Sequence, residues 1–427
     1  MFCDQCSQTV PGGCKVHGVC GKDENVASLQ DILIYGLKGV AAYNYHANRL
    51  GYHDKEIDAF VSEALFSTLT NVNFDAGRFV NYVLEAGRIN IKAMELLDKA
   101  NTEKFGTPAP REVSTAVKDG RGILVTGHDL LSIYELLEQT EGKGINVYTH
   151  GEMLPAHGYP KINKFKHLAG NYGGAWALQK KEFDDFEGAI LSNTNCILIP
   201  KDSYRDRLFT SDITGIEGVK HINGSDFSPI IKKALELPKM KARKGKTILT
   251  GFHYKNVLEI ADKLIALIKE GKIKHFFLIG GCDTPGEKGT YYREFAKLVP
   301  KDCVILTLAC GKYRFNDIDF GDIDGIPRLI DLGQCNNTYS ALEIAKALAQ
   351  AFKTDINNLP LSLVLTWFEQ KAVAILLSLL HLGIKNVYLG PVAPEFISSG
   401  VFNILKDKFN LNLISTPKED MGSILKK

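Results

Sequence analysis

The chain has 427 residues, too many for one ordinary domain, so we expect two to four domains. Hydrophobic residues make up 45% of it and charged residues 23%, a composition typical of globular proteins and unlike that of disordered or fibrous ones. The formal net charge of +2 gives no reason to expect a nucleic-acid partner. Apolar runs are too short to cross a membrane, and no secretory signal or transit peptide is visible, so we expect a cytoplasmic protein.

Three helices are predicted in the first hundred residues. Apolar residues recur at helical spacing in residues 27–49, 57–69 and 79–97. Short polar connections between these segments favour a three-helix bundle. Residues 101–121 contain Pro108, Pro110 and Gly120 and are predicted to form a linker.

From Gly122 onward, short β-rich runs alternate with helical ones, the pattern of α/β domains with parallel sheets. The predicted strands form two series: residues 123–126, 145–148, 189–191 and 197–199, then 247–250, 276–279, 304–308, 328–331, 362–366 and 387–389. Helices are expected at 339–352 and 369–381. We therefore predict an amino-terminal three-helix bundle (1–110) followed by two doubly wound parallel-sheet, Rossmann-like domains (111–244 and 245–427).

Four of the nine cysteines lie close together in the pattern Cys3-x2-Cys6-x7-Cys14-x5-Cys20. An odd number of cysteines in a reducing compartment favours ligands or reactive thiols over disulfides. Thiolates bind iron–sulfur clusters or zinc, and this spacing matches neither a ferredoxin nor a zinc ribbon. We favour an iron–sulfur cluster, with structural zinc and unligated thiols as the alternatives.

A second group of candidates follows predicted strands. Cys282, Cys310 and Cys335 each lie just beyond the carboxyl end of a strand, with glycine nearby. Ligands bind at this edge of open parallel sheets, so the three thiols can converge on one site. Three other residues of metal-binding type follow strands in the same way: His128, Glu152 and Glu369.

Each of these residues also has a purely structural interpretation. A lone buried cysteine is usually a small hydrophobic residue, which is the preferred interpretation of Cys303 and of Cys196 taken alone. His150 and His157 compete with His128 as a ligand, and local sequence does not separate the three.

Together these residues resemble the hybrid cluster (prismane) proteins, the hydroxylamine reductase family. The opening Met1-Phe2-Cys3-Asp4-Gln5-Cys6, with Cys14 and Cys20, resembles the family's site for a 4Fe–4S cluster. The other similar motifs are Thr126-Gly127-His128-Asp129-Leu130, His150-Gly151-Glu152-Met153-Leu154-Pro155-Ala156-His157, Asn193-Thr194-Asn195-Cys196, Gly280-Gly281-Cys282-Asp283, Thr307-Leu308-Ala309-Cys310-Gly311-Lys312-Tyr313-Arg314-Phe315, Gly333-Gln334-Cys335-Asn336 and Trp367-Phe368-Glu369-Gln370-Lys371-Ala372. The resemblance extends over nearly the whole chain and is to a short subclass that lacks a second helical bundle.

The resemblance implies two metal clusters. The first is the 4Fe–4S cluster on the amino-terminal cysteines. The second is a hybrid four-iron cluster that contains sulfide and oxygen and carries a persulfide at Cys282. Its implied ligands are His128, Glu152, Cys196, Cys282, Cys310, Cys335 and Glu369. The resemblance thus selects His128 and leaves His150 and His157 with supporting roles.

The implied function is an oxidoreductase that reduces hydroxylamine to ammonia and water, or nitric oxide, with a role in nitrosative stress. Electrons would enter at the first cluster and pass to the hybrid cluster. No GxGxxG motif follows a strand, so we expect an external ferredoxin-like or reductase donor. We expect Glu369, Lys371 and Cys282 to be catalytic, with Lys371 as the proton source; a solvated helix lysine is the alternative for Lys371.

Two other functions and one assembly state follow from the same pattern. A protein S-nitrosylase or nitric oxide sensor would use the same cluster. An enzyme like carbon monoxide dehydrogenase would need more thiolates and no pair of glutamates such as Glu152 and Glu369. Because loss of the second bundle should expose apolar surface, we predict a homodimer formed through the amino-terminal module.

Overall fold

A computed structural model describes residues 3–426 and divides the chain into two compact units. The first unit comprises the chain up to Ala100 and from Leu348 onward, and the second unit is Asn101–Ala347. Met1 and Phe2, which open the predicted cluster motif, lie outside the described residues. The predicted domain boundaries at 110/111 and 244/245 stay a prediction.

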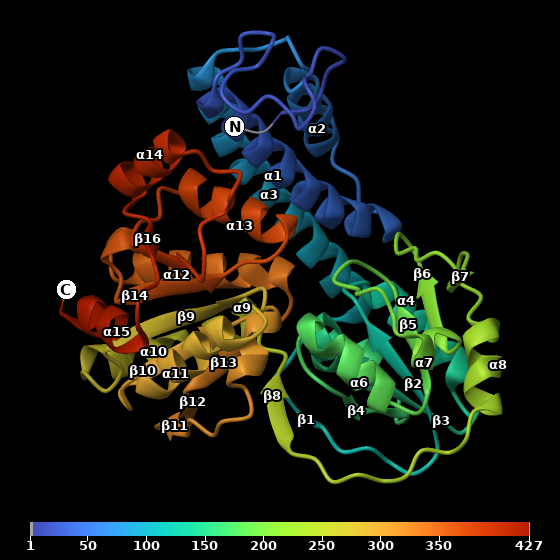
Figure 1. The fold of residues 1–427 in the computed structure, drawn as a ribbon. Helices are drawn as coiled ribbons and strands as arrows, with labels where there is room; N and C mark the ends of the chain where they lie inside the picture. Colours follow the sequence, from blue (N-terminus) through green and yellow to red (C-terminus); the bar gives the residue numbers. More distant parts are fainter. Residues whose placement is uncertain (1–2, 427) are drawn as a thin grey trace. The chain divides into compact units, whose positions relative to one another are not determined.

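Helices of the first unit begin with α1 (Glu24–Arg49), α2 (Lys55–Ser67) and α3 (Ala76–Phe105), whose last turn belongs to the second unit (Figure 1). The three predicted helices are therefore confirmed. The predicted linker is wrong at its start because α3 continues to Phe105, whose side chain is fully buried. Gly106 follows with a positive φ of 87°, a conformation that commonly ends a helix.

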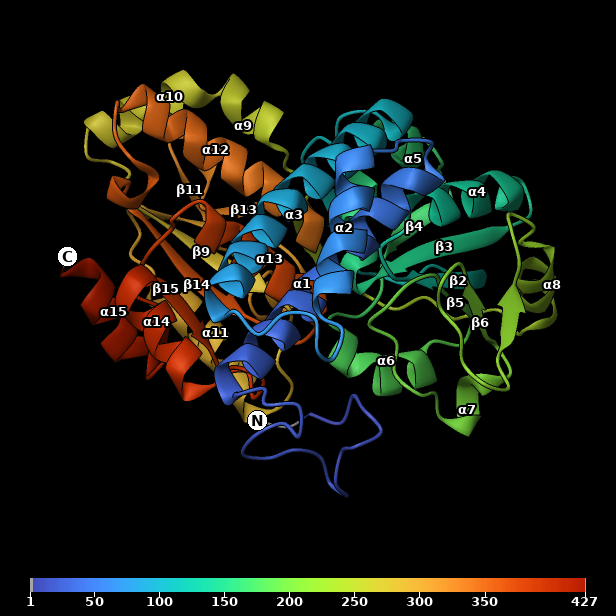
Figure 2. The same cartoon turned by 90° about the horizontal axis from the view of Figure 1, so that it is seen from above.

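A helix from the carboxyl-terminal part of the chain, α13 (Gln370–His381), packs against α1 and α3 (Figures 1 and 2). Glycines allow this close packing. A Cβ on Gly39 would lie 2.5 Å from Ala374 Cβ, and one on Gly87 would lie 2.1 Å from the carbonyl oxygen of Leu377. The helical core of the first unit thus combines both ends of the sequence.

The rest of the first unit is a short parallel sheet and its helices. Its strands pair in the order β14-β15-β16, which are Leu361–Thr366, Val387–Gly390 and Asn412–Leu413. The accompanying helices are η6 (Ile356–Asn358), α14 (Ser399–Phe409) and α15 (Pro417–Leu425). The predicted strands at 362–366 and 387–389 are confirmed.

The second unit begins with a six-stranded parallel sheet in the order β4-β3-β2-β5-β6-β7. Its strands are β2 (Arg121–Thr126), β3 (Ile145–His150), β4 (Leu168–Asn171), β5 (Ala189–Ser192), β6 (Leu208–Ser211) and β7 (Lys220–Ile222). Its helices are α4 (Leu130–Thr140), η1 (Gly151–Gly158), α5 (Pro160–Asn163), η2 (Trp176–Leu178), α6 (Gln179–Asp185), α7 (Asp202–Arg205) and α8 (Ser228–Glu236). Apolar central strands are expected when helices cover both faces of a parallel sheet.

The strand predicted at residues 197–199 is wrong. Ile199 is 67% exposed, and the backbone N–H of Leu198 donates to the side-chain oxygen of Gln179 instead of to another strand. β6 occupies the position beside β5. A short apolar run becomes a strand only where a neighbouring strand can pair with it, which these residues lack.

Three further strands of this unit pair in parallel in the order β13-β10-β9, which are Leu329–Asp331, Cys303–Thr307 and His275–Gly281. Around them lie α9 (Tyr254–Glu259), α10 (Ala261–Lys269), η3 (Glu287–Gly289), α11 (Thr290–Leu298), η4 (Cys310–Arg314), β11 (Asp322–Ile323), β12 (Ile326–Pro327), η5 (Cys335–Asn337) and α12 (Thr338–Ala351), which ends in the first unit. The predicted fold class, helices followed by α/β segments with parallel sheets, is confirmed.

One pairing differs from the prediction. β1 (Arg111–Ser114) lies inside the predicted linker and pairs antiparallel with β8 (Thr247–Thr250), which we expected in a parallel sheet. The two strands are far apart in the sequence, so local pattern could not reveal their pairing. In the part of the chain that is described, no helix is both long and apolar enough to cross a membrane.

Candidate metal centres

Three side chains of different ligand type meet at the carboxyl edge of the sheets in the second unit. His128 Nε2 lies 3.7 Å from Glu152 Oε2, and the backbone N–H of Cys335 donates to that same oxygen at 2.8 Å. Ligand atoms of His128, Glu152 and Cys335 all lie within 4.8 Å of one another, and within residues 3–426 this is the only such group. All three side chains are buried, so they form a preorganised site with imidazole, carboxylate and thiol donors.

The orientation of His128 is fixed by its surroundings. Its Nδ1 lies 2.8 Å from Thr194 Oγ1, which turns Nε2 toward Glu152. Gly127 has a φ of +126°, and a Cβ there would lie 1.9 Å from Asn193 Oδ1. A ligand histidine is commonly held through its other ring nitrogen in this way.

His150 and His157, the competing histidines, have other partners. His150 Nε2 lies 2.9 Å from Glu182 Oε2, and His157 Nε2 lies 3.1 Å from Thr149 Oγ1. Burial lowers the pKa of His157 to about 4, so its ring is neutral at pH 7. Of these three histidines, His128 is the one whose ring lies in the group with Glu152 and Cys335.

Cys310 lies at the start of η4 and is buried. Burial raises the pKa of its thiol well above the usual value, and the negative charges of Glu152, Cys196 and Cys282 raise it further. Glu152, Cys196 and Cys282 are therefore near enough to Cys310 for their charges to act on its thiol. A bound metal would stabilise the thiolate form, because cysteine ligates metals in its deprotonated state. Cys303, by contrast, is the first residue of β10, and burial raises its pKa to about 12, as expected for a structural cysteine.

Cys196, which the sequence alone favoured as structural, lies in the loop after β5. It packs in one cluster with Cys310 and Trp176 and has a positive φ of 68°. Asn195 Nδ2 donates to its sulfur at 3.1 Å. A positive φ is uncommon for a residue other than glycine, which sets Cys196 apart from an ordinary buried cysteine.

Glu369 and Lys371 belong to the first unit. Glu369 caps α13, because its Oε2 accepts a hydrogen bond from the backbone N–H of Lys371 at 3.0 Å. Lys371 Nζ lies 3.8 Å from Glu369 Oε1, with side-chain exposures of 5% and 16%. Lys371 is thus a buried lysine beside a carboxylate, not a solvated helix lysine.

The amino-terminal cysteines share one folded segment. Cys3 and Cys14 form an antiparallel bridge, with N–H to carbonyl hydrogen bonds of 3.3 Å and 2.8 Å. Cys6 Sγ lies 3.6 Å from Thr9 Oγ1, and this hydrogen bond lowers the pKa of Cys6. Four sulfurs around one zinc ion would lie roughly 3.8 Å apart. Among the described residues, no three of these cysteine sulfurs lie within 4.8 Å of one another.

Lys22, which the sequence analysis did not single out, lies beside this segment. Its side chain is only 1% exposed, and Nζ lies 4.0 Å from Cys3 Sγ. The charge of Lys22 is also one of the causes that lower the pKa of Cys6. Its position two residues after Cys20 is the sequence signal that could have suggested this role.

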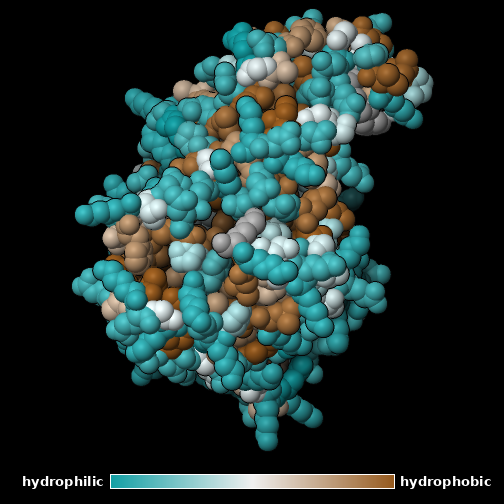
Figure 3. Space-filling model, turned by 90° about the vertical axis from the view of Figure 1, so that its left-hand side faces the viewer, coloured by the Kyte–Doolittle hydropathy of each residue, from teal (hydrophilic) through white to brown (hydrophobic). Residues whose placement is uncertain are grey.

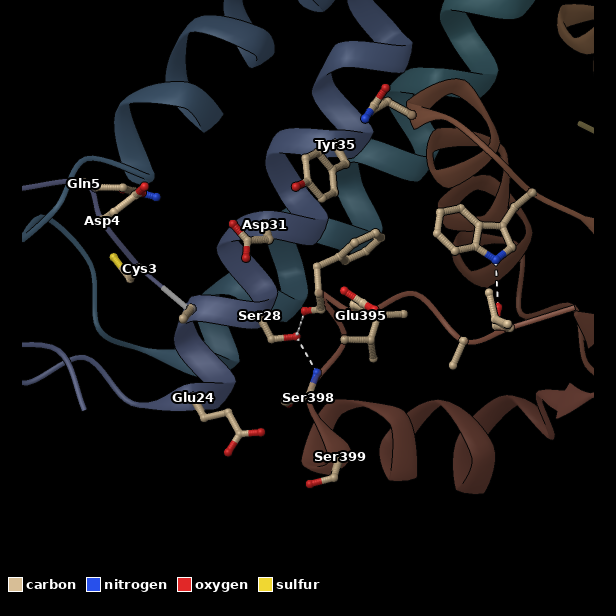
Figure 4. Close-up of a pocket in the computed structure, with 17 residues that line it drawn as sticks. Cys3, Asp4, Gln5, Glu24, Ser28, Asp31, Tyr35, Glu395, Ser398 and Ser399 are labelled. Carbon is tan, nitrogen blue, oxygen red and sulfur yellow. Dashed lines mark hydrogen bonds between the residues drawn. The ribbon is translucent and has the colours of Figure 1, made fainter. Parts of the chain in front are cut away.

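Cys3 also lines a cavity of about 990 Å³ in the first unit (Figure 4). The cavity wall carries four carboxylates, those of Asp4, Glu24, Asp31 and Glu395. Burial raises the pKa of Asp31. Of the four amino-terminal cysteines, Cys3 is the one that lines this cavity.

Comparison with known proteins gives one family. Residues 1–86 and 78–422 match the model described as the Prismane/CO dehydrogenase family. Two relatives described as hydroxylamine reductase come from Moorella thermoacetica, 61% identical over 100% of both chains, and Thermotoga maritima, 56% identical over 100% of this chain and 99% of the relative. A relative with the same description from Geobacter metallireducens is 45% identical in an alignment of 545 residues, so it is longer than this chain.

Solved structures share the fold at low sequence identity. Carbon monoxide dehydrogenase IV from Carboxydothermus hydrogenoformans has a TM-score of 0.78 at 17% identity and covers 100% of this chain and 92% of its own. A nickel-free carbon monoxide dehydrogenase from Thermococcus sp. AM4 has a TM-score of 0.77 at 17% identity, with coverage of 100% and 90%. At this identity the likeness concerns the fold alone.

Proposed function

Because this chain belongs to the Prismane/CO dehydrogenase family, we propose that it is an iron–sulfur oxidoreductase that reduces hydroxylamine to ammonia and water. Relatives with that description align with it over its full length at 61% and 56% identity. The observation that carries the proposal is the buried group of His128, Glu152 and Cys335, whose ligand atoms lie within 4.8 Å of one another.

The donor sets fit two iron–sulfur groups. Cys3, Cys6, Cys14 and Cys20 would hold a 4Fe–4S cluster. A hybrid iron–sulfur–oxygen cluster, with a persulfide on Cys282, would be held by His128, Glu152, Cys196, Cys282, Cys310, Cys335 and Glu369. Thiolates suit the sulfide-rich part of such a cluster, and imidazole and carboxylate suit iron that faces oxygen. When bound, the cluster would supply electrons and Lewis-acid iron for cleavage of the N–O bond.

Reduction of hydroxylamine takes up two electrons and two protons for each N–O bond cleaved, so the site needs an acid. In our proposal Lys371 Nζ is the proton donor, because it is buried beside Glu369 rather than exposed to solvent. Glu369 holds this ammonium group and also the first turn of α13. Cys282 completes the proposed catalytic set.

Electrons would come from an external ferredoxin-like or reductase partner. Cys3 lines the large cavity of the first unit, which leaves the amino-terminal cysteines approachable by such a donor. We also expect a cytoplasmic location, because both proposed clusters and their thiolate ligands need a reducing environment.

We also propose a homodimer formed through the amino-terminal module. Five large hydrophobic side chains in the last turn of α2 and in the segment that leads to α3 are at least 43% exposed: Leu65, Phe66, Leu69, Val72 and Phe74. Figure 3 shows brown, apolar atoms among teal, polar ones at its upper end, the end at which Figure 1 shows the amino-terminal segment and α2. Clustered apolar exposure of this kind usually marks an interface.

Two other activities would use the same residues. Reduction of nitric oxide, with a role in nitrosative stress, needs the same cluster and proton source. A protein S-nitrosylase or nitric oxide sensor would need the cluster but little turnover. Carbon monoxide dehydrogenase chemistry is disfavoured because Glu152 fills a place among the donors where more thiolates would be expected.

The test is anaerobic turnover of the purified protein with hydroxylamine and a one-electron donor. We expect ammonia to form in proportion to hydroxylamine consumed, together with iron, acid-labile sulfide and EPR signals for two centres. Cys335→Ser should abolish ammonia formation and the hybrid-centre signal. Full cluster signals with negligible consumption of hydroxylamine or nitric oxide would overturn the reductase and favour the sensor.

A further inference from the structure

Lys312, Tyr313 and Arg314 follow Cys310 in the same 3-10 turn, η4, and each bonds a different loop of the second unit. The three loops are those that carry Cys335, Glu152 and Cys282. None of the three residues is itself a proposed ligand.

Lys312 holds the loop that leads to Cys335. Its Nζ lies 2.6 Å from Asp331 Oδ1 and 2.8 Å from the carbonyl oxygen of Gly333, and both charged side chains are fully buried. Asp331 in turn accepts hydrogen bonds from the backbone N–H of Gly333 and from Thr250 Oγ1. Buried ion pairs contribute little net stability, so their best-supported use is to specify one arrangement.

Tyr313 holds the loop of Glu152. Its phenolic oxygen donates to the carbonyl oxygen of Gly151 at 2.7 Å, one residue before Glu152. The ring packs in the apolar cluster of Cys310 and Trp176. Through one side chain, the backbone next to Glu152 is thus tied to the turn that carries Cys310.

Arg314 holds the loop of Cys282. It forms a two-pronged ion pair with Asp283, at 2.5 Å from Nε to Oδ1 and 3.1 Å from Nη2 to Oδ2, and also donates to the carbonyl oxygen of Thr284. A Cβ on Gly289 would lie 2.4 Å from Arg314 Nη2, so glycine leaves room for the guanidinium. Planar two-pronged pairs fix geometry better than single contacts do.

We propose that Lys312, Tyr313 and Arg314 are positioning residues that hold Cys335, Glu152 and Cys282 around Cys310 before any cluster is bound. The proposal rests on the ligand set proposed above. The contacts of Lys312, Tyr313 and Arg314 restrain these loops without any metal, because each is made by protein atoms alone. The single turn η4 supplies this restraint for all three loops. The four proposed donors, Cys335, Glu152, Cys282 and Cys310, are thus held relative to the same turn.

Three variants remove the contacts separately. Tyr313→Phe removes only the hydroxyl, Arg314→Lys removes the two-pronged geometry, and Lys312→Met with Asp331→Asn removes both buried charges together. Two controls remove equally buried contacts elsewhere in the second unit. Tyr148→Phe removes a hydroxyl that accepts the N–H of Lys118, and Arg328→Gln removes donors to the carbonyls of Val299, Pro300, Cys303 and Phe320.

Hydrogen exchange of the metal-free full chain is the first measurement. We expect exchange about tenfold faster in residues 151–158 for Tyr313→Phe, in 282–289 for Arg314→Lys and in 331–337 for the double variant, with no such change in the controls. Wild-type exchange in all three loops would overturn the proposal. Because this measurement uses no cluster, it is independent of the proposed reductase activity.

The ratio of hybrid-centre to amino-terminal-centre EPR signal in the loaded protein is the second measurement, with the amino-terminal centre as internal control. We expect this ratio to fall at least about threefold in each of the three variants that change Lys312, Tyr313 or Arg314, and to stay at the wild-type value in both controls. An unchanged ratio in Tyr313→Phe, the mildest change, would also overturn the proposal. If the wild-type chain holds no hybrid centre, the ligand assignment fails, while faster loop exchange would still support the positioning role.

Discussion

Lys371 Nζ lies 3.8 Å from Glu369 Oε1 at the start of α13, and both side chains are largely buried. If Lys371 donates protons, Lys371→Met should lower kcat for hydroxylamine by about 100-fold, the usual scale for loss of a general acid. KM and the EPR signals of both centres should stay close to wild type. Lys346→Met is the control, because Lys346 pairs with Glu343 on an exposed face of α12. Turnover within a factor of two of wild type would remove Lys371 from the mechanism.

Glu369→Ala should damage catalysis far more than folding. Loss of its cap on α13 should lower the free energy of unfolding by about 1 kcal/mol. Turnover should fall at least about tenfold, since a proposed ligand is lost while the thiolates remain. Glu369→Gln keeps an oxygen that can cap the helix and separates the two effects. Near wild-type turnover in both variants would contradict the assignment of Glu369.

The two proposed centres should be separable. The four amino-terminal cysteines and the proposed ligands of the hybrid site have no residue in common. Cys6→Ser should therefore abolish the EPR signal of the amino-terminal centre and leave the hybrid centre detectable. Turnover with an external donor should fall, because electron entry is lost. Iron and sulfide analysis should show a loss confined to one cluster. Disappearance of both signals together would mean that the centres are not independent.

Assembly can be tested at the exposed apolar residues at the end of α2 and in the segment that leads to α3. Light scattering at micromolar concentration should give twice the 47.2 kDa mass of one chain, and Phe66→Asp should convert the dimer to a monomer. Ile213→Asp is the control, since Ile213 is 70% exposed in the second unit. A wild-type mass near 47.2 kDa would refute the dimer.

His157 should make stability depend on pH. Its pKa is about 4 in the folded chain, below the usual 6.5, so between these values the unfolded chain binds a proton that the folded chain does not. The stabilisation is complete above pH 6.5 and is lost as the pH falls toward 4, by up to about 3 kcal/mol. Denaturant unfolding of His157→Gln should show a flatter decline over this range than wild type. The exposed His221→Gln should decline like wild type; equal curves for all three proteins would show that His157 does not contribute.

The sequence by itself determined the placement of chemistry at strand ends. Helical periodicity located α1, α2 and much of α3, and β-rich runs located β2, β3, β9 and β10. Because the carboxyl ends of parallel strands lie at one edge of a sheet, the sequence also predicted that His128, Glu152 and Cys310 lie at such an edge. Resemblance to a family then supplied the ligand set that local pattern left open.

Tertiary structure alone decided which partners each residue has. The pairing of β1 with β8, the packing of α13 on α1 and α3, and the burial of Lys371 all depend on segments far apart in the sequence. The orientation of His128 toward Glu152, and the different partners of His150 and His157, depend on contacts with Thr194, Glu182 and Thr149. Periodicity reports only which face of its own helix or strand a residue occupies, so such contacts become visible only once the elements have packed.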